Sequence, residues 1–70
     1  MKTYNLTSND MVCAPGLIAW AINGAKFKRD RNQMIKIIAA TWSLPRPAAK
    51  ALVTGAVPHT VTDETVSFTA

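Results

Sequence analysis

The chain has 70 residues, which is enough for one small domain and too few for two independently stable cores. Hydrophobic residues make up 49% and charged residues 17%, a balance that excludes an intrinsically disordered chain. Eight Lys and Arg against four Asp and Glu give a net charge of +4, which favours an acidic partner. We therefore expect residues 1–70 to form a single small domain.

The compartment and the membrane relation follow from one cysteine and one apolar run. Cys13 has no partner within the chain, so a reducing compartment such as the cytoplasm fits best. The run from Met11 to Ala25 is shorter than the roughly 18 residues that cross a bilayer, and Pro15 and Asn23-Gly24 interrupt it. Asp10 directly before the run argues against a secretion signal. We expect no membrane insertion.

The N-terminal residues predict a short strand followed by a helix. Lys2 to Leu6 alternates polar and apolar side chains around Tyr4, as in a strand. Thr7 to Asp10 then supplies side chains that accept hydrogen bonds from the free N–H groups at a helix start. Because proline suits the first helical position, the regular helix is expected from about Pro15.

Two apolar stripes run along residues 17–29. The first consists of Leu17, Ile18, Ala21, Ile22 and Ala25, and the second of Trp20, Gly24 and Phe27. Their spacing favours a helix that is apolar on two faces and is wrapped by its own domain or shared with another copy, which makes a homodimer an option. A hairpin remains the alternative, since Asn23-Gly24 is a strong turn signal and Ala25 to Lys28 alternates after it.

The middle of the chain predicts two further helices. After Asp30 as a cap, the residues Met34, Ile37, Ile38, Thr41 and Trp42 recur at helical spacing. Pro45 and Pro47 end this helix. A short helix then runs from Pro47 to Thr54, and Gly55 closes it. Its inward residues are expected to be Ala48, Ala51 and Leu52.

The tail from Val57 to Ala70 changes to a period of two, which predicts a β-hairpin. With Asp63-Glu64 in the loop, Val61 faces Val66 and His59 faces Phe68, so both apolar sets share one side. Asp-Glu is not a preferred pair for a two-residue turn, which leaves the loop length open. The expected fold class is α+β, with two to three short helices, a C-terminal β-hairpin and a short N-terminal strand.

Few residues of this chain can carry chemistry. General acid–base catalysis needs a titratable group that a second group orients, and the chain offers one His and four carboxylates. The spacing of Cys13 and His59 gives no reason to expect a nucleophile and base, and the two cannot make a four-ligand zinc site. We read His59 as a strand residue. We expect a non-enzymatic protein without catalytic residues, metal or cofactor.

Positive residues concentrate between the first two predicted helices and at the start of the third. They are Lys26, Lys28, Arg29, Arg31, Arg46 and Lys50. Such density near helix ends suits phosphate binding, because the cations add to free backbone N–H groups. The alternative is that these residues form an ordinary solvated face.

Residues 38–55 contain the small residue Ala39, then Leu44 directly before a proline, and then Ala49 and Leu52 on the short helix that follows. This segment resembles the two-helix core of lambda-repressor-type helix-turn-helix domains. The resemblance implies that Ala39 lets the helices cross closely, that Leu44 fills the turn and that Ala49 and Leu52 pack the second helix. The chain departs from that pattern at two positions: Ser43 stands where the family favours glycine, and Pro45 stands where it favours a capping side chain. Helices followed by a hairpin also resemble small winged-helix accessory regulators of mobile elements. An acidic hairpin tip disfavours contact of that wing with phosphate.

The resemblance and the cations together predict a small DNA-binding accessory regulator that uses a basic patch. The alternative is a protein-interaction or inhibitor module of a mobile element. In that case Trp20, Phe27 and the hairpin edge bind a protein partner and the charges provide solubility.

Overall fold

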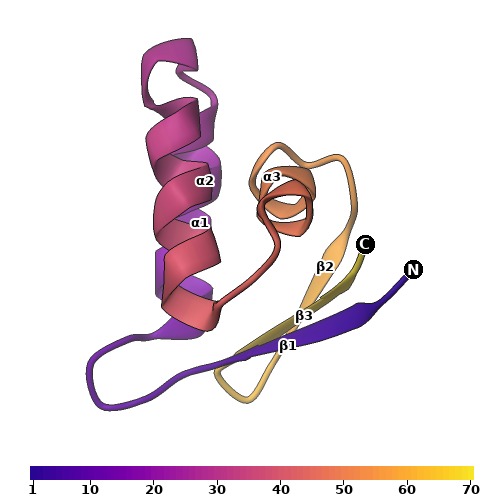
Figure 1. The fold of residues 1–70 in the computed structure, drawn as a ribbon. Coiled ribbons are helices and arrows are strands. Elements are labelled where there is room, and N and C mark those ends of the chain that lie inside the picture. The colour runs from indigo at the N-terminus through magenta and orange to yellow at the C-terminus, as the bar shows by residue number, and fades with distance from the viewer.

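The computed structural model describes residues 1–70 as an α+β domain of three helices and one three-stranded antiparallel sheet (Figure 1). In chain order the elements are β1 (Thr3–Thr7), α1 (Ala14–Ala25), α2 (Lys28–Trp42), α3 (Arg46–Val53), β2 (His59–Thr62) and β3 (Thr65–Thr69). The predicted fold class is therefore confirmed. The N-terminal strand pairs with β3, which gives the strand order β1-β3-β2 and places the two termini side by side.

The C-terminal hairpin has the predicted register. Val61 lies opposite Val66 and His59 lies opposite Phe68. The loop has two residues, Asp63-Glu64, with φ of 46° and 63°. Positive φ at both positions is the signature of a type I′ turn, whose twist matches that of the flanking strands. The hairpin therefore closes tightly although Asp-Glu is not the preferred pair for this turn.

Residues 17–25 are helical, and the hairpin alternative at Asn23-Gly24 is wrong. α1 continues through this pair to Ala25, and its contacts with α2 explain why. A Cβ atom added at Gly24 would lie 3.0 Å from the Sδ atom of Met34. The glycine therefore serves close packing between two antiparallel helices instead of a chain reversal.

α2 begins earlier than predicted. Its N-cap is Phe27, whose backbone is extended and whose side chain makes no capping hydrogen bond, so Phe27 lies outside α1 and does not extend the second apolar stripe of that helix. Asp30, the predicted cap, lies within the first turn instead, with Oδ1 at 3.4 Å from the Nε of Arg29. There its negative charge suits the positive end of the helix dipole.

Three residues join α2 to α3, and the first of them, Ser43, has left-handed backbone angles (φ 54°, ψ 45°). α3 begins and ends one residue earlier than predicted. Its buried residues are Ala48, Ala49, Leu52 and Val53. Ala51, which we expected to face inward, is only half-buried.

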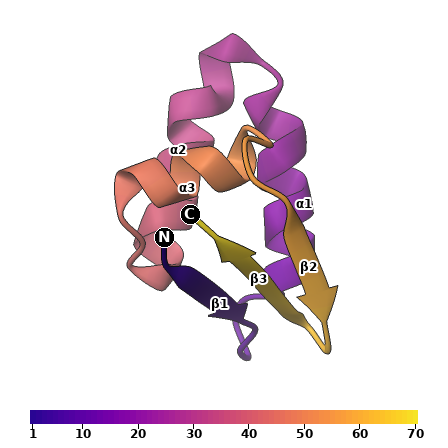
Figure 2. The same ribbon diagram turned by 90° about the vertical axis from the view of Figure 1, so that its right-hand side faces the viewer.

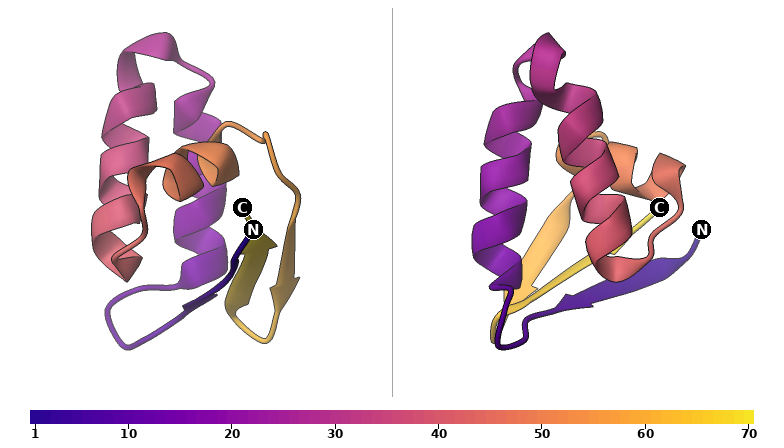
Figure 3. Two further views of the ribbon diagram at one scale, coloured as in Figure 1. Left: turned by 45° about the vertical axis from the view of Figure 1, so that its right-hand side comes forward. Right: turned by 60° about the vertical axis from the view of Figure 1, so that its left-hand side comes forward.

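The helices pack on one face of the sheet, and 14 buried residues, all apolar, form the core between them (Figures 2 and 3). The sheet contributes Leu6, Val66 and Phe68. His59 and Val61 share that face by register, but both stay exposed because β2 is an edge strand. The other face carries only uncharged polar side chains, from Thr3, Asn5, Thr7, Thr60, Thr62, Thr65, Ser67 and Thr69.

Candidate nucleic-acid interface

Four of the six predicted contact residues surround the connection between α1 and α2. Lys26 is the C-cap of α1, and Lys28, Arg29 and Arg31 lie in the first turns of α2. All but Arg31 are exposed. No side chain caps the start of α2, so the free N–H groups and the positive end of the helix dipole add to these cations. Positive charge therefore concentrates at this end of the molecule.

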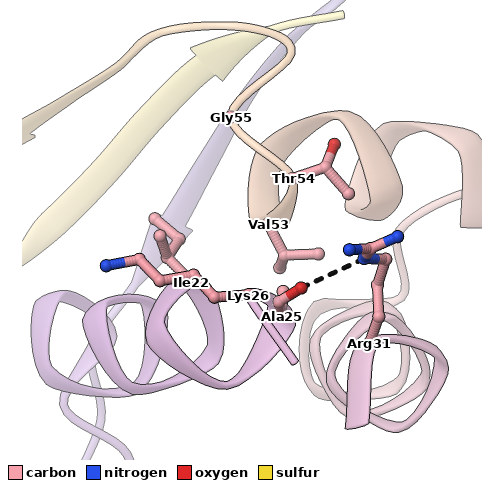
Figure 4. A pocket seen from close by; sticks show the side chains of 7 residues that line it. All are labelled: Ile22, Ala25, Lys26, Arg31, Val53, Thr54 and Gly55. Atoms are coloured by element: carbon pink, nitrogen blue, oxygen red, sulfur yellow. Dashed lines mark hydrogen bonds between the residues drawn. The ribbon is translucent and has the colours of Figure 1, made fainter. Parts of the chain in front are cut away.

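Arg31 is held in place by the end of the preceding helix. Its Nε atom donates a hydrogen bond to the carbonyl oxygen of Ala25 at 3.0 Å (Figure 4). Ala25 is the last residue of α1, so the bond also satisfies a carbonyl at the negative end of that helix dipole. The terminal nitrogens of the half-buried guanidinium keep their donors for another acceptor.

An open groove of about 410 Å³ lies between the end of α1, the start of α2 and the end of α3. Its lining consists of Ile22, Ala25, Lys26, Arg31, Val53, Thr54 and Gly55. In Figure 4 the amine of Lys26 and the guanidinium of Arg31 extend on opposite sides of the groove. The chain can leave α3 sharply here because Gly55 has a φ of 77°, as the predicted helix stop requires. We call these seven residues the basic groove.

α3 presents the other two predicted contact residues on its solvent face. Arg46, Lys50 and Thr54 follow each other at four-residue spacing and are exposed, whereas the opposite face is buried. The hydroxyl of Thr54 donates to the carbonyl oxygen of Lys50 at 2.6 Å, which ties the threonine side chain to the end of α3. The exposed face of α3 is therefore cationic at its start and its middle.

The six predicted residues do not meet at one point. Lys28 begins α2, which has 15 residues and so spans about 22 Å. Arg46 follows the other end of that helix. The end of α3 links the two groups, because Val53 and Thr54 line the basic groove together with Lys26 and Arg31. The cations therefore form an extended track from α3 to the α1–α2 connection.

Acidic residues gather at the opposite end of α1. The hydroxyl of Ser8 donates to the carbonyl oxygen of Glu64 at 2.5 Å and accepts from the backbone N–H of Ala14 at 2.7 Å. These bonds place the β2–β3 turn, and the loop that contains Asp10, beside the start of α1. The 12 residues of α1 put about 18 Å between this end and Lys26. Only the fourth acid, Asp30, lies among the cations.

This separation changes the reading of the acidic hairpin tip. The tip was expected to approach phosphate if the hairpin acted as a wing, and that would be unfavourable. The bond from Ser8 to the carbonyl of Glu64 instead holds the tip near the first turn of α1. Its charge therefore lies at the far end of α1 from the basic groove.

Sequence reasoning missed two residues that shape the basic groove, namely Ile22 and Val53. Gly55 was the available signal, since a glycine after a short helix indicates a sharp change of direction. No three His, Cys, Asp or Glu side chains gather in the arrangement that a metal ion needs. Of the three helices, none combines the length and the apolar character that a bilayer crossing requires.

Comparison of the chain with protein-family models, with curated proteins and with solved structures finds no match in any of the three.

Proposed function

We propose that this chain is a small, non-enzymatic module that binds double-stranded DNA through the solvent face of α3 and the α1–α2 connection. The observation that carries the proposal is the cationic track of Arg46, Lys50, Lys26 and Arg31, with three of the four acids at the other end of α1. DNA affinity comes largely from neutralising phosphates with Lys and Arg. A molecule with such a charge distribution approaches DNA with its cations first.

The α2–α3 pair supports a helix-turn-helix role within this proposal. The left-handed Ser43 occupies the position where lambda-repressor-type domains favour glycine, and left-handed angles explain that preference. Leu44 in the turn packs against the core, and Ala49 and Leu52 on α3 are fully buried. In such domains the second helix of the pair lies in the major groove. Here that helix is α3.

Base reading by α3 would be sparse. Arg46 and Lys50 can donate to guanine, and Thr54 can contact either partner of a base pair. The remaining exposed positions of α3 are Pro47 and the half-exposed Ala51, which offer only apolar contact. We expect binding that depends mainly on phosphates and discriminates weakly between sequences.

The test uses two matched lysines. Binding of a fluorescent 20-base-pair duplex is measured by anisotropy between about 50 and 200 mM salt, where each phosphate contact contributes a slope of about 0.9 in log affinity against log salt. Lys50→Ala is expected to lower the slope by about one contact. Lys36→Ala, which changes another exposed lysine, on α2 and outside the predicted set, is expected to leave the slope unchanged.

Two results would reject the proposal. One is the absence of binding by micromolar protein at about 50 mM salt, where non-specific contacts are strongest. The other is an equal loss for Lys36→Ala and Lys50→Ala, because α3 would then have no special part. Charge reversal at Lys28 and Arg29 extends the test to the α1–α2 connection and is expected to reduce the slope further.

A protein-binding role is the second candidate, and exposed aromatic residues favour it. Trp20 is 50% exposed and Phe27 is 59% exposed, although aromatic side chains of this size usually contribute to a core. A partner protein that binds the wild type and is lost on Trp20→Ala, with DNA affinity unchanged, would favour this candidate. The single free thiol of Cys13 suits the cytoplasm in either role.

A further inference from the structure

The outer edge of β2 carries backbone groups without partners. Lys2 and Ala70 exchange two backbone hydrogen bonds of 2.9 and 3.0 Å, and bonded pairs recur every second residue along β1 and β3. The backbone N–H and C=O groups of Phe68 and Val66 therefore point toward β1, and those of Ser67 point toward β2. It follows from the register that Thr60 and Thr62 bond to β3, while the N–H and C=O groups of His59 and Val61 point outward.

This edge lacks the usual protection against pairing. Natural edge strands carry charged residues, prolines or bulges that prevent association with another strand. The four residues of β2 are uncharged, regular and exposed, and Val61 leaves 53% of its surface in solvent. The other edge of the sheet is partly closed, because the indole Nε1 of Trp42 donates to the carbonyl oxygen of Thr7 at 3.0 Å. β2 therefore presents the more open of the two edges.

We propose that two copies of this chain associate by antiparallel pairing of their β2 strands about a two-fold axis at Thr60. In this register His59 of each copy pairs with Val61 of the other, which forms four backbone hydrogen bonds. No donor is missing at Pro58, because the even-numbered positions of this strand point toward β3. A register centred one residue away would need Val57 or Asp63, which lie outside β2. The product is a continuous six-stranded sheet.

The charges of the chain favour a second copy of the same chain as the partner that pairs with the open edge of β2. In the proposed register the turn with Asp63 lies beside residues 56–58 of the partner. That segment leads into β2 from the basic groove, which contains Lys26 and Arg31. Opposite charges therefore approach each other twice across the axis, and no like charges meet within the strands.

The inference does not rest on the proposed function. The start of α3 lies against β1, since Tyr4, Pro45 and Pro47 line one apolar groove at the other edge of the sheet. Pairing through β2 leaves the start of α3 accessible, while it brings the partner's acidic turn toward the basic groove. The contact is short, so we expect an affinity between about 10 µM and 1 mM, as for small transient interfaces.

Engineered disulfides test the register. Residues at a non-hydrogen-bonded antiparallel pair have Cα atoms about 4.5 Å apart, which a disulfide can bridge. In a Cys13→Ser background, Thr60→Cys is therefore expected to form a covalent dimer under mild oxidation. Thr62→Cys, which changes another exposed threonine on the same strand, should remain largely monomeric because its counterpart lies several residues away. Equal cross-linking of both variants, or of neither, would overturn the proposal.

Sedimentation of the unmodified chain tests the pairing itself. The wild type is expected to shift from monomer toward dimer as its concentration rises to about 1 mM. Val61→Pro removes an outward N–H without removing a bond to β3, so it should weaken the dimer at least tenfold while far-UV circular dichroism stays native. Val61→Thr, which keeps the N–H, should weaken it less. A wild type that stays monomeric, or a Val61→Pro variant that dimerises as well as wild type, would refute the pairing.

Discussion

One hydroxyl, that of Ser8, joins the sheet to the start of α1, and its removal should destabilise the whole domain. Ser8 donates to the carbonyl oxygen of Glu64 and accepts from the backbone N–H of Ala14. Ala14 is completely buried, so water cannot replace the lost acceptor. Ser8→Ala therefore removes one hydrogen bond and leaves a buried donor without a partner.

The expected cost follows from these two terms. A net hydrogen bond contributes about 1 kcal/mol, and a buried unsatisfied donor costs about 1 to 3 kcal/mol. Their combination lowers the free energy of unfolding by about 2 to 4 kcal/mol. A domain of this length has a total stability of about 3.5 to 10 kcal/mol. Tm should consequently fall by about 10 to 30 °C.

Urea titration followed by far-UV circular dichroism measures this loss. The midpoint should fall while the slope of the transition stays constant, since the fold itself is unchanged. Ser67→Ala is the matched control, because it also removes a serine hydroxyl with a hydrogen bond, here to the side chain of Asn5 on the exposed face of the sheet. It should cost less than about 1 kcal/mol. A Ser8→Ala variant as stable as Ser67→Ala would refute this account of the junction.

Three further variants test the local backbone and one tertiary contact. Ser43→Gly should stabilise the domain by about 0.5 kcal/mol in urea titration, because glycine tolerates left-handed angles but gains entropy on unfolding; a loss of stability would contradict the left-handed turn. D63N/E64G should raise Tm by several degrees, since Asn-Gly suits a type I′ turn, and an unchanged or lower Tm would argue against that turn type. Trp42→Phe should cost about 1 kcal/mol and speed hydrogen exchange in β1, because the indole bond to Thr7 is lost; unchanged exchange would show that this bond does not hold the strand.

Local patterns of the sequence predicted most of the elements. The two-residue period of the tail placed Val61 opposite Val66, because side chains alternate between the faces of a strand and the loop fixes the register. The spacing of apolar residues predicted α2, and the prolines predicted its end. Asn23-Gly24 misled as a turn signal, since its helical conformation depends on contact with Met34, ten residues further along the chain.

The candidate interface was also only partly predictable from the sequence. Composition alone identified an excess of positive charge, and helix ends indicated where it would concentrate. Neither could show that Arg31 donates a hydrogen bond to the carbonyl oxygen of Ala25, or that the end of α3 completes the basic groove beside Arg31. The distance between Lys28 and Arg46 is also a property of the folded chain, because it depends on the length of α2 and on the path of the chain after it.

Thus the sequence by itself determined the fold class, the period of each element and the sign of the charge, all of which depend on neighbours a few residues apart. Only the tertiary structure decided which cations lie together, where the acids lie relative to them and which strand edge stays open. Those features arise when segments distant in sequence meet around a shared apolar core, as Ser8, Ala14 and Glu64 do at the junction of sheet and helix. The hydrophobic effect that forms this core is non-directional, so local patterns cannot specify such meetings.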